Sequence, residues 1–277
     1  MAHIALVGAG NMGFALLSRW SGVRNYHITV FEPDEGLRAR AASLGAKALG
    51  SPDKLPEKPP VDVLVIATKP QTIGEIAARY APYLPANVLV ISIAAGIDLD
   101  AIAQRLGRRA AIIRAMPNTP AMIGEGMIVC CPNSEADNAG YRNLAERRMS
   151  LVGRAAFIED ESLMDAVTAV SGSGPAYLFH FIEAFFAAGV EAGLDSTLAM
   201  SLAKQTVFGA AKLAIESAET PSVLRQQVTS PNGTTAAALE ILMADGGGLG
   251  RLLARTVSAA KHRSVELRLA RNERDNE

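Results

Sequence analysis

The sequence predicts an α/β fold in which an N-terminal Rossmann-like, doubly wound parallel sheet is followed by an all-helical domain. In the first half of the chain, short apolar runs rich in Val, Ile and Leu alternate with helical patterns. Continuous apolar strands separated by helices are typical of a parallel sheet covered on both faces. From Glu161 onward only long helical stretches follow. We therefore expect an α/β domain at 1–160 and a helical domain at 161–277.

The individual elements follow from hydrophobic periodicity and from the residues that interrupt it. The candidate strands, each bounded by Gly, Pro, Asn or Asp, are Ile4–Val7, Ile28–Phe31, Val63–Ala67, Val88–Ile91 and Ile112–Ile113. The helical segments between them are Met12–Trp20, Gly36–Leu44, Ile73–Tyr80 and Leu99–Leu106. In the second domain we expect helices at Ser162–Val170, Pro175–Ala192, Ser196–Ser217, Thr234–Ala244 and Leu249–Leu269.

Composition limits which kinds of binding partner and which cellular compartment we expect for this protein. The 277 residues carry a formal net charge of -1, without the basic excess of proteins that bind nucleic acid or acidic membranes. The most apolar stretch, Ala176–Val190, contains His180 and Glu183 and is too short and too polar to span a bilayer. Without a signal peptide, we expect a cytoplasmic protein. Cys130 and Cys131 are adjacent, which favours two buried thiols over a disulfide or a metal site.

A glycine-rich turn follows the first strand and opens a helix, reading Gly8-Ala-Gly10-Asn-Met-Gly13. Gly8 allows the tight turn, Gly10 lets the backbone approach a pyrophosphate, and Gly13 allows close packing of helix on strand. Backbone N–H groups of the loop, including Asn11 and Met12, then face the phosphates at the positive helix end. The context of strand, loop and helix favours a dinucleotide site over a purely structural turn.

Glu32 lies at the end of the second strand, and two interpretations of it remain open. An acidic residue there can bind the adenosine ribose hydroxyls, which favours NADH and repels the extra phosphate of NADPH. Alternatively, Glu32 begins a turn and caps the next helix.

Five further motifs occur in a defined order. They are Ala67-Thr-Lys-Pro-Gln71, Ser92-Ile-Ala-Ala-Gly-Ile97, Arg114-Ala-Met-Pro-Asn-Thr-Pro120, Ser171-Gly-Ser-Gly-Pro-Ala-Tyr177 and Val228-Thr-Ser-Pro-Asn-Gly-Thr-Thr235. Together the set resembles pyrroline-5-carboxylate reductase, and the resemblance runs from Ile4 to about Leu267. The family reduces 1-pyrroline-5-carboxylate to L-proline by hydride transfer from NADPH or NADH, the last step of proline biosynthesis.

The resemblance implies roles for single residues. It implies that the cofactor lies against Gly8, Gly10, Asn11, Met12, Gly13, Ala67, Lys69, Pro70, Ala94 and Ala95, to which the position of Glu32 adds a candidate ribose contact. It implies that the substrate carboxylate binds at Ser230, Asn232, Gly233, Thr234 and Thr235, with the Thr235 hydroxyl as the catalytic contact to the imine nitrogen. It also implies that the helical domain forms a homodimer with the active site at the subunit junction, and it leaves a larger oligomer of dimers open.

Two departures from the family pattern bear on these expectations. Asn232-Gly233 stands where relatives usually have two glycines, and Asn tolerates left-handed backbone angles, so we expect the turn to persist. Many relatives end the second strand with a residue that can meet the 2′-phosphate of NADPH, whereas this chain has Glu32. The preference between the two cofactors therefore stays open.

Several of these motifs also have a purely structural interpretation, and other functions compete with the one above. The segments at Ser171–Tyr177 and Thr229–Thr235 can be helix caps, and Lys69 can pair with a surface carboxylate. A β-hydroxyacid dehydrogenase would need a lysine early in the helix after Gly174, and none is present. Other cyclic-imine reductases and a non-catalytic dinucleotide-binding redox sensor are the remaining alternatives. The four histidines lie outside every motif, so we expect them to be structural or solvated.

Overall fold

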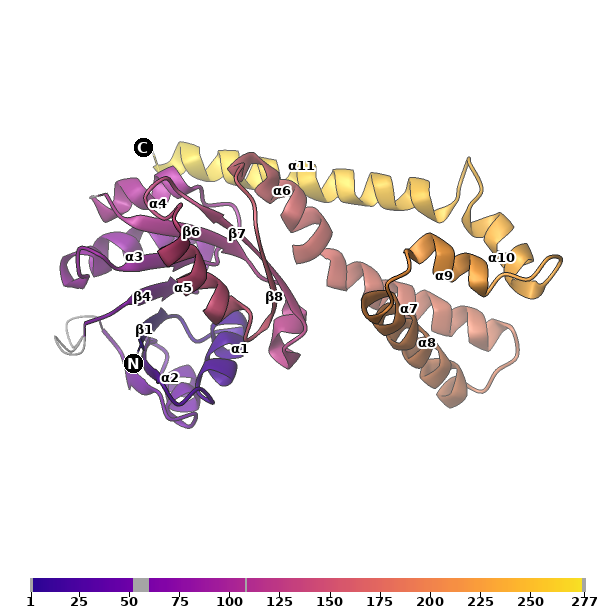
Figure 1. The fold of residues 1–277 in the computed structure, drawn as a ribbon, viewed down its shortest axis with the longest axis horizontal. Helices are drawn as coiled ribbons and strands as arrows, with labels where there is room; N and C mark the ends of the chain where they lie inside the picture. The colour runs from indigo at the N-terminus through magenta and orange to yellow at the C-terminus, as the bar shows by residue number, and fades with distance from the viewer. Residues whose placement is uncertain (1, 52–59, 108, 276–277) are drawn as a thin grey trace. The chain divides into compact units, whose positions relative to one another are not determined.

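The computed structural model describes residues 2–51, 60–107 and 109–275, and its elements are labelled in Figure 1. Contacts between residues divide the chain into two units. The first unit runs up to Ser173 and also includes the residues from Ala260 on, whereas the second unit is Gly174–Ala259. The boundary predicted after residue 160 follows the end of the strands, while the contact-based division lies after Ser173.

One mixed sheet forms the centre of the first unit, in the strand order β3-β2-β1-β4-β5-β6-β7-β8. Its strands are β1 (Ala2–Val7), β2 (Tyr26–Phe31), β3 (Lys47–Leu49), β4 (Val63–Ile66), β5 (Leu89–Ser92), β6 (Ala111–Met116), β7 (Gly126–Pro132) and β8 (Gly153–Phe157). All neighbouring pairs are parallel except β6 with β7. The order reverses between β1 and β4, which confirms the predicted doubly wound sheet. The sequence did not predict β3, β7 or β8.

Helices cover both faces of this sheet (Figure 1). They are α1 (Asn11–Trp20), α2 (Glu35–Ala42), α3 (Ile73–Tyr80), α4 (Leu99–Leu106), α5 (Ala139–Met149) and α6 (Met164–Val167). Shorter turns are the 3-10 helices η2 (Pro70–Thr72), η3 (Ala81–Tyr83), η4 (Thr119–Ile123) and η5 (Glu161–Leu163), and the π-helical turn η6 (Thr168–Gly172). The predicted α1 to α4 are confirmed, whereas α5 was not predicted.

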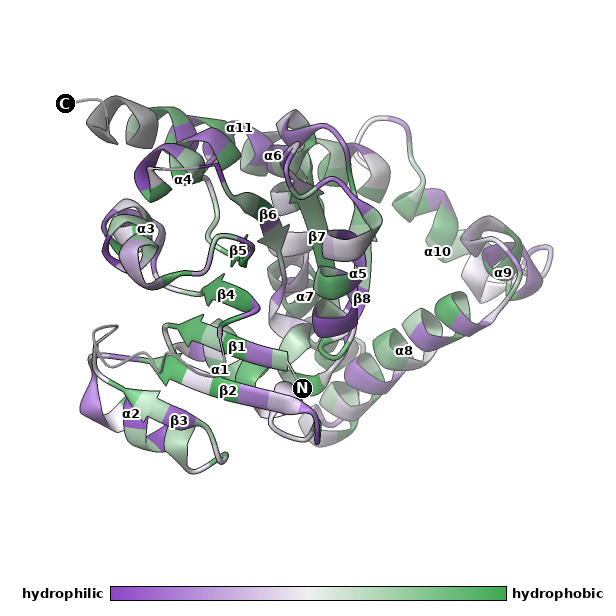
Figure 2. Cartoon of the chain, turned by 60° about the vertical axis from the view of Figure 1, so that its left-hand side comes forward, coloured by the Kyte–Doolittle hydropathy of each residue, from purple (hydrophilic) through white to green (hydrophobic). Residues whose placement is uncertain are grey.

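The core of the first unit is split by the sheet into two apolar clusters. Ile4 and Leu6 of β1 belong to the cluster that includes Trp20 of α1, whereas Ala5 and Val7 belong to the other cluster. This alternation follows from the period of two along a strand. Figure 2 shows β1 and β4 mostly in the colour of apolar residues. Because both faces are covered, only the ends of the strands remain for a ligand.

The second unit consists of helices. They are α7 (Gly174–Glu191), α8 (Ser196–Glu216), α9 (Pro221–Gln227), α10 (Thr234–Leu242) and α11 (Leu249–Asp275), whose last part belongs to the first unit. Asp195 begins α8, since its carboxylate accepts hydrogen bonds from the N–H groups of Thr197 and Leu198. The predicted long helices are confirmed, and α9 is an addition to them.

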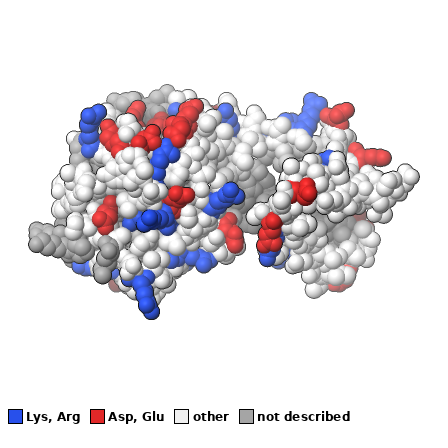
Figure 3. Space-filling model, viewed as in Figure 1, with Lys and Arg blue, Asp and Glu red and all other residues white. Residues whose placement is uncertain are grey.

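The second unit buries few of its own apolar side chains. Among its residues, all of which the structure describes, only Ala199 and Ala203 are buried apolar side chains. Large apolar side chains are exposed instead, including Phe179 at 60%, Phe208 at 61% and Ile241 at 76%. The view of Figure 3 shows broad areas without charge over these helices. Exposed apolar surface of this extent is typical of an interaction site.

None of the helices in the described part of the chain combines the length and the apolar character that crossing a bilayer requires.

Candidate cofactor and substrate sites

The loops that follow β1, β4 and β5 meet at one edge of the sheet, because their strands are parallel neighbours. Backbone hydrogen bonds fix their starts: Gly8 N–H donates to Phe31 O at 2.9 Å, and Ala67 N–H donates to Val7 O at 2.8 Å. Ile93 N–H donates in turn to Ile66 O at 3.1 Å. The structure therefore brings the predicted cofactor residues of all three loops to the carboxyl ends of the strands. In open α/β sheets this edge, at the point where the strand order reverses, is where ligands bind.

The glycines of the first loop are required by its geometry. Gly8 has a φ of +95°, and a Cβ on it would lie 2.8 Å from the carbonyl oxygen of Ala67. A Cβ on Gly13 would collide with the carbonyl oxygen of Gly8. Gly10 differs, because nothing lies within 4 Å of the place where its Cβ would be. The loop is packed against β4 behind and open in front, which fits a pyrophosphate approaching the backbone at Gly10.

Helix α1 presents unpaired donors to that open side. Gly10 is the N-cap residue and makes no side-chain cap, and the first intrahelical bond runs from Phe14 N–H to Gly10 O at 2.8 Å. The N–H groups of Asn11, Met12 and Gly13 therefore have no acceptor in the helix. Aligned donors and the positive end of the helix dipole attract anions. The residues present thus fit the phosphates of a dinucleotide.

Glu32 is buried, with 7% of its surface exposed, and both of its carboxylate oxygens accept hydrogen bonds. One accepts from Ala9 N–H at 2.7 Å, and the other accepts from Asp34 N–H at 3.0 Å. The cap of α2 is Asp34, which accepts from Leu37 N–H. Glu32 therefore holds the turn after β2 against the glycine-rich loop, and it is not the residue that caps the helix.

The loop after β4 contributes an unpaired hydroxyl that the sequence analysis did not single out. Thr68 Oγ1 is buried and has no hydrogen-bond partner among the described residues, and Thr68 Cγ2 would lie 3.2 Å from a Cβ on Gly8. Lys69 is exposed and makes no ion pair with any described carboxylate. Pro70 begins η2 directly after it. A bound ligand can supply the hydrogen-bond partner that this buried hydroxyl beside the glycine loop lacks.

Asn118 joins two of the sequence motifs and was not predicted as a site residue. Its amide Nδ2 donates to the carbonyl oxygen of Ser171 at 3.1 Å, and its Oδ1 accepts from Met127 N–H at 2.8 Å. A Cβ on Gly172 would lie 2.5 Å from the Cε of Met116. The segment Ser171–Gly172 is therefore held at the end of β6. The clustering of Gly, Pro and Asn in both motifs was a sequence signal for this arrangement. It does not indicate which side chain forms a hydrogen bond with which residue.

The predicted substrate loop forms a sharp turn before α10. Asn232 has a φ of +56°, so the left-handed conformation expected for Asn in place of Gly is confirmed. Gly233 N–H donates to Ser230 O at 3.1 Å, and a Cβ on Gly233 would collide with Ser230 Oγ. The turn therefore accepts Asn at 232, whereas a side chain at 233 would have to displace the Ser230 hydroxyl.

The start of α10 offers donors in the same way as α1 does. Its N-cap residue, Gly233, makes no side-chain cap, and the first intrahelical bond joins Ala237 N–H to Gly233 O at 3.2 Å. The N–H groups of Thr234, Thr235 and Ala236 are left without helical acceptors. The half-buried Thr235 also has no hydrogen-bond partner for its hydroxyl among the described residues. A small carboxylate fits such a helix start.

The predicted site residues thus fall into two sets. The cofactor set lies in the first unit and the substrate set in the second. The histidines stand apart from both: His3 Nε2 pairs with Thr29 Oγ1 at 2.9 Å, and His180 and His262 pair with glutamates one turn away on exposed helix faces. The prediction that they are structural or solvated is confirmed for these three.

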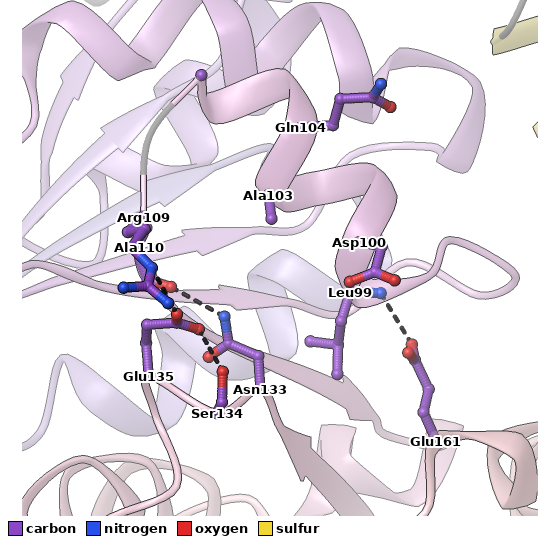
Figure 4. A pocket seen from close by; sticks show the side chains of 11 residues that line it. Leu99, Asp100, Ala103, Gln104, Arg109, Ala110, Asn133, Ser134, Glu135 and Glu161 are labelled. Carbon is purple, nitrogen blue, oxygen red and sulfur yellow. Dashed lines mark hydrogen bonds and ion pairs between the residues drawn. The ribbon is translucent and has the colours of Figure 1, made fainter.

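A cavity of about 640 Å³ lies elsewhere on the first unit, beside α4 (Figure 4). Part of its polar lining is engaged within the protein, since Asn133 Oδ1 accepts from Ile112 N–H and its Nδ2 donates to Ala110 O. Arg109 forms an ion pair with Glu135 at 3.3 Å. Among its described lining residues, no buried side-chain polar atom lacks a hydrogen-bond partner as Thr68 Oγ1 does. The loops at the strand ends therefore remain the candidate cofactor site.

Comparison with known proteins finds similarity over both units. A family model described as pyrroline-5-carboxylate reductase dimerisation matches residues 161–267. A second, described as NADP oxidoreductase coenzyme F420-dependent, matches residues 3–96. A pyrroline-5-carboxylate reductase of Pseudomonas aeruginosa is 39% identical over 268 residues, which cover 96% of this chain and 96% of that protein.

Solved structures agree with this. The structure of a pyrroline-5-carboxylate reductase from Coxiella burnetii superposes with a TM-score of 0.90 at 32% identity, covering 96% of this chain and 98% of that one. The Plasmodium falciparum pyrroline carboxylate reductase, with NADP bound, has a TM-score of 0.81 at 28% identity over 96% of this chain and 98% of its own. The similarity therefore includes the glycine-rich loop as well as the turn before α10.

Proposed function

This chain belongs to the pyrroline-5-carboxylate reductase family, and from that premise we propose how its own residues carry the reaction. It is an NAD(P)H-dependent oxidoreductase that reduces 1-pyrroline-5-carboxylate to L-proline, the last step of proline biosynthesis. The observation that carries this activity is the 39% identity over nearly the whole of both chains. The bound nicotinamide supplies the hydride that adds to the imine carbon.

The cofactor is held by the loops at the strand ends. The residues we assign to it are Gly8, Gly10, Asn11, Met12, Gly13, Glu32, Ala67, Lys69, Pro70, Ala94 and Ala95. The free N–H groups of α1 receive the pyrophosphate, which their alignment and the helix dipole favour. The loops at Ala67–Pro70 and Ala94–Ala95 line the nicotinamide-ribose side. Lys69, exposed and without an ion pair among the described residues, is a cation available for this purpose.

The substrate carboxylate binds at the start of α10. The residues we assign to it are Ser230, Asn232, Gly233, Thr234 and Thr235. The unpaired N–H groups at this helix start donate to the carboxylate oxygens, and the positive end of the helix stabilises their charge.

Thr235 is the catalytic residue in this assignment. Its hydroxyl oxygen, which has no hydrogen-bond partner in the described part of the chain, accepts a hydrogen bond from the protonated imine nitrogen and keeps that contact as the nitrogen becomes an amine. The ring imine is basic enough to bring its own proton, so no histidine or carboxylate is needed to donate one. The protein's contribution is then chiefly to fix the ring by its carboxylate and nitrogen.

The helical unit makes the chain a homodimer, because the matched dimerisation segment coincides with the apolar surface described above. We propose that this surface, on α7, α8 and α10, is the dimer contact. Further assembly of dimers into a larger oligomer stays a proposal, and sedimentation distinguishes it from a single dimer.

The activity is tested by following absorbance of NADPH and of NADH in the presence of 1-pyrroline-5-carboxylate, with proline identified as the product. Oxidation of either cofactor only when the imine is present is the expected result. Oxidation of a β-hydroxy acid with NAD(P)⁺ instead, or cofactor binding without turnover of any cyclic imine, would contradict the assignment.

A further inference from the structure

A cluster of charged side chains in the first unit joins the last part of α11 to the loop that follows β5. Its members are Asp98, Arg114, Glu161, Asp165, Ser264 and Arg268. We propose that Arg268 is a positioning residue for the reaction, acting through Asp98 on the loop that carries Ala94 and Ala95. This inference rests on the proposed cofactor role of that loop.

The first half of the cluster fixes Arg268. Asp165 is only 3% exposed, and its two carboxylate oxygens have different partners. Ser264 Oγ donates to one at 2.6 Å, and Arg268 Nε donates to the other at 3.2 Å. A buried carboxylate is costly without such partners, so Asp165 holds Ser264 and Arg268, one turn apart on α11, against α6.

The second half carries the contact from Arg268 to Asp98. Arg268 Nη1 lies 3.6 Å from Asp98 Oδ2, and Asp98 Oδ1 lies 3.1 Å from Arg114 Nη1. Asp98 therefore lies between two guanidinium groups, of which that of Arg114 is 3% exposed. With opposite charges on both sides, Asp98 has little freedom to move.

Asp98 ends the loop in question. That loop begins where Ile93 N–H donates to Ile66 O, and it ends at Asp98, the N-cap residue of α4. Directly after it, Leu99 N–H donates to Glu161 Oε1 at 2.9 Å (Figure 4), and this oxygen also lies 2.9 Å from Arg114 Nη1. The end of the loop that carries the nicotinamide contacts is thus set by charges, and Arg268 supplies the one that comes from the far end of the sequence.

Helix α11 gives this contact a functional meaning. The helix begins at Leu249 in the unit that forms the dimer, and its continuous backbone reaches the first unit with Ser264 and Arg268. A helix transmits a shift along its axis because each residue is bonded to the next turn. The end of the cofactor loop is therefore tied to α11, a helix whose first part belongs to the second unit.

The test measures cofactor affinity in the full-length dimer, without substrate, by fluorescence titration of NADPH and NADH. Arg268→Gln removes both ion pairs, and we expect its Kd to rise about tenfold, within the usual range for coupling between sites. Asp98→Asn should raise the Kd by a similar factor. The double variant should raise the Kd no further than either single variant, because Arg268 acts through Asp98. The matched control is Arg263→Gln on the same helix, where the arginine is 68% exposed and, among the described residues, forms an ion pair only with Glu266; its Kd should stay unchanged.

Hydrogen exchange supplies a readout that a merely structural role would not move. In Arg268→Gln the amides of residues 94–98 should exchange faster while those of β1 and β4 keep their rates. A lower melting temperature with unchanged Kd and unchanged exchange in this loop would overturn the proposal. If Arg268→Gln does not fold, Arg268→Lys takes its place: an intermediate Kd supports the proposal, and a wild-type Kd overturns it. Because no imine is used, a wild-type protein inactive on 1-pyrroline-5-carboxylate would refute the activity without deciding this point.

Discussion

The carboxylate of Glu32 accepts a hydrogen bond of 2.7 Å from the backbone N–H of Ala9, in the middle of the glycine-rich loop. The same carboxylate accepts from Asp34 N–H, so one side chain ties the loop to the turn after β2. A carboxylate has about four lone-pair sites, and two remain for ribose hydroxyls. Glu32 can therefore hold the loop and face the cofactor at once.

Replacing Glu32 tests this double role. Glu32→Gln keeps an acceptor oxygen but removes the charge, so kcat/KM for NADPH relative to NADH should rise, by about fivefold if the lost repulsion is about 1 kcal/mol. Glu32→Ser removes both acceptors and should also lower the free energy of unfolding by about 1–3 kcal/mol. Steady-state kinetics with both cofactors and chemical denaturation give the two numbers. A ratio that stays constant in both variants would limit Glu32 to holding the loop.

Thr235→Val deletes the hydroxyl and keeps the β-branched shape. We expect kcat with 1-pyrroline-5-carboxylate to fall by about 10²-fold, the low end for loss of a contact to the reacting centre, because the imine can carry its own proton. The affinity for NADPH should not change. Near-full kcat in this variant would refute the catalytic assignment of Thr235, whatever the fold.

Thr234→Val is the matched control for Thr235. Its backbone N–H remains at the start of α10, so carboxylate binding should persist and kcat should fall much less. Equal losses in the two variants would show that the helix start, and not the Thr235 hydroxyl, had been disturbed.

The exposed apolar side chains of the second unit predict that the protein is a dimer or a larger assembly at micromolar concentration. Sedimentation velocity at moderate salt measures this directly. Replacing Phe208 with Glu places a charge on a side chain that is 61% exposed in the single chain, and it should shift the equilibrium toward the monomer. A wild-type protein that sediments as a monomer would contradict the interface proposed here.

Arg148 lies in the core of the first unit with only 2% of its surface exposed. Its Nη1 donates to Leu144 O at 2.7 Å and its guanidinium carbon lies 5.4 Å from the centre of the Tyr26 ring, but its Nε and Nη2 have no hydrogen-bond partner among the described residues, and burial lowers the pKa of its guanidinium. Arg148→Met should therefore raise the free energy of unfolding by about 1–4 kcal/mol, as is found when buried charges are replaced by apolar side chains. Arg147→Met, at the exposed neighbouring position, should change it by less than about 0.5 kcal/mol. Destabilisation by Arg148→Met would reveal a partner for those nitrogens.

The two cysteines should be unreactive in the folded protein. Burial raises the pKa of the Cys130 thiol to about 12 and that of Cys131 to about 11, from 9.0, so neither forms a thiolate near neutral pH. Mass spectrometry after iodoacetamide at pH 8 should find both unmodified until guanidinium is added. Because the unfolded thiols lose protons from about pH 9 and the folded ones do not, the free energy of unfolding should fall as the pH rises from 9 toward 11. Rapid alkylation of the native protein would contradict this.

The sequence predicted the parts of the fold that repeat a simple period. The buried parallel strands β1, β2, β4, β5 and β6 are continuous apolar runs, and α1 to α4 separate them. In contrast, β3 has three residues and is defined by its pairing with β2, and β8 contains few large apolar side chains. The polar α5 lacks a clear apolar stripe, although Asn138 caps it by accepting from Tyr141 N–H. Such elements depend on partners that are distant in sequence.

The same distinction applies to the site. The glycine-rich loop and the turn at Asn232-Gly233 are local, and their required backbone angles are visible in the residues themselves. The contact of Glu32 with Ala9 was not predicted, since sequence spacing cannot distinguish it from a contact with ribose. The ion pairs of Arg114 with Asp98 and with Glu161 join positions 16 and 47 residues apart, and no periodicity signals them.

The bond between Asp165 and Ser264 has a consequence for the order in which the protein is made. The two residues are 99 positions apart, and every strand of the sheet precedes both. At about 5–20 residues per second, a ribosome takes roughly 5–20 s to travel from one to the other. During that interval the sheet can already form, while the carboxylate of Asp165, which is buried in the complete fold, is still solvated. The first unit therefore cannot reach its final packing until the whole second unit has been translated, which makes its completion one of the last events in the synthesis of the chain.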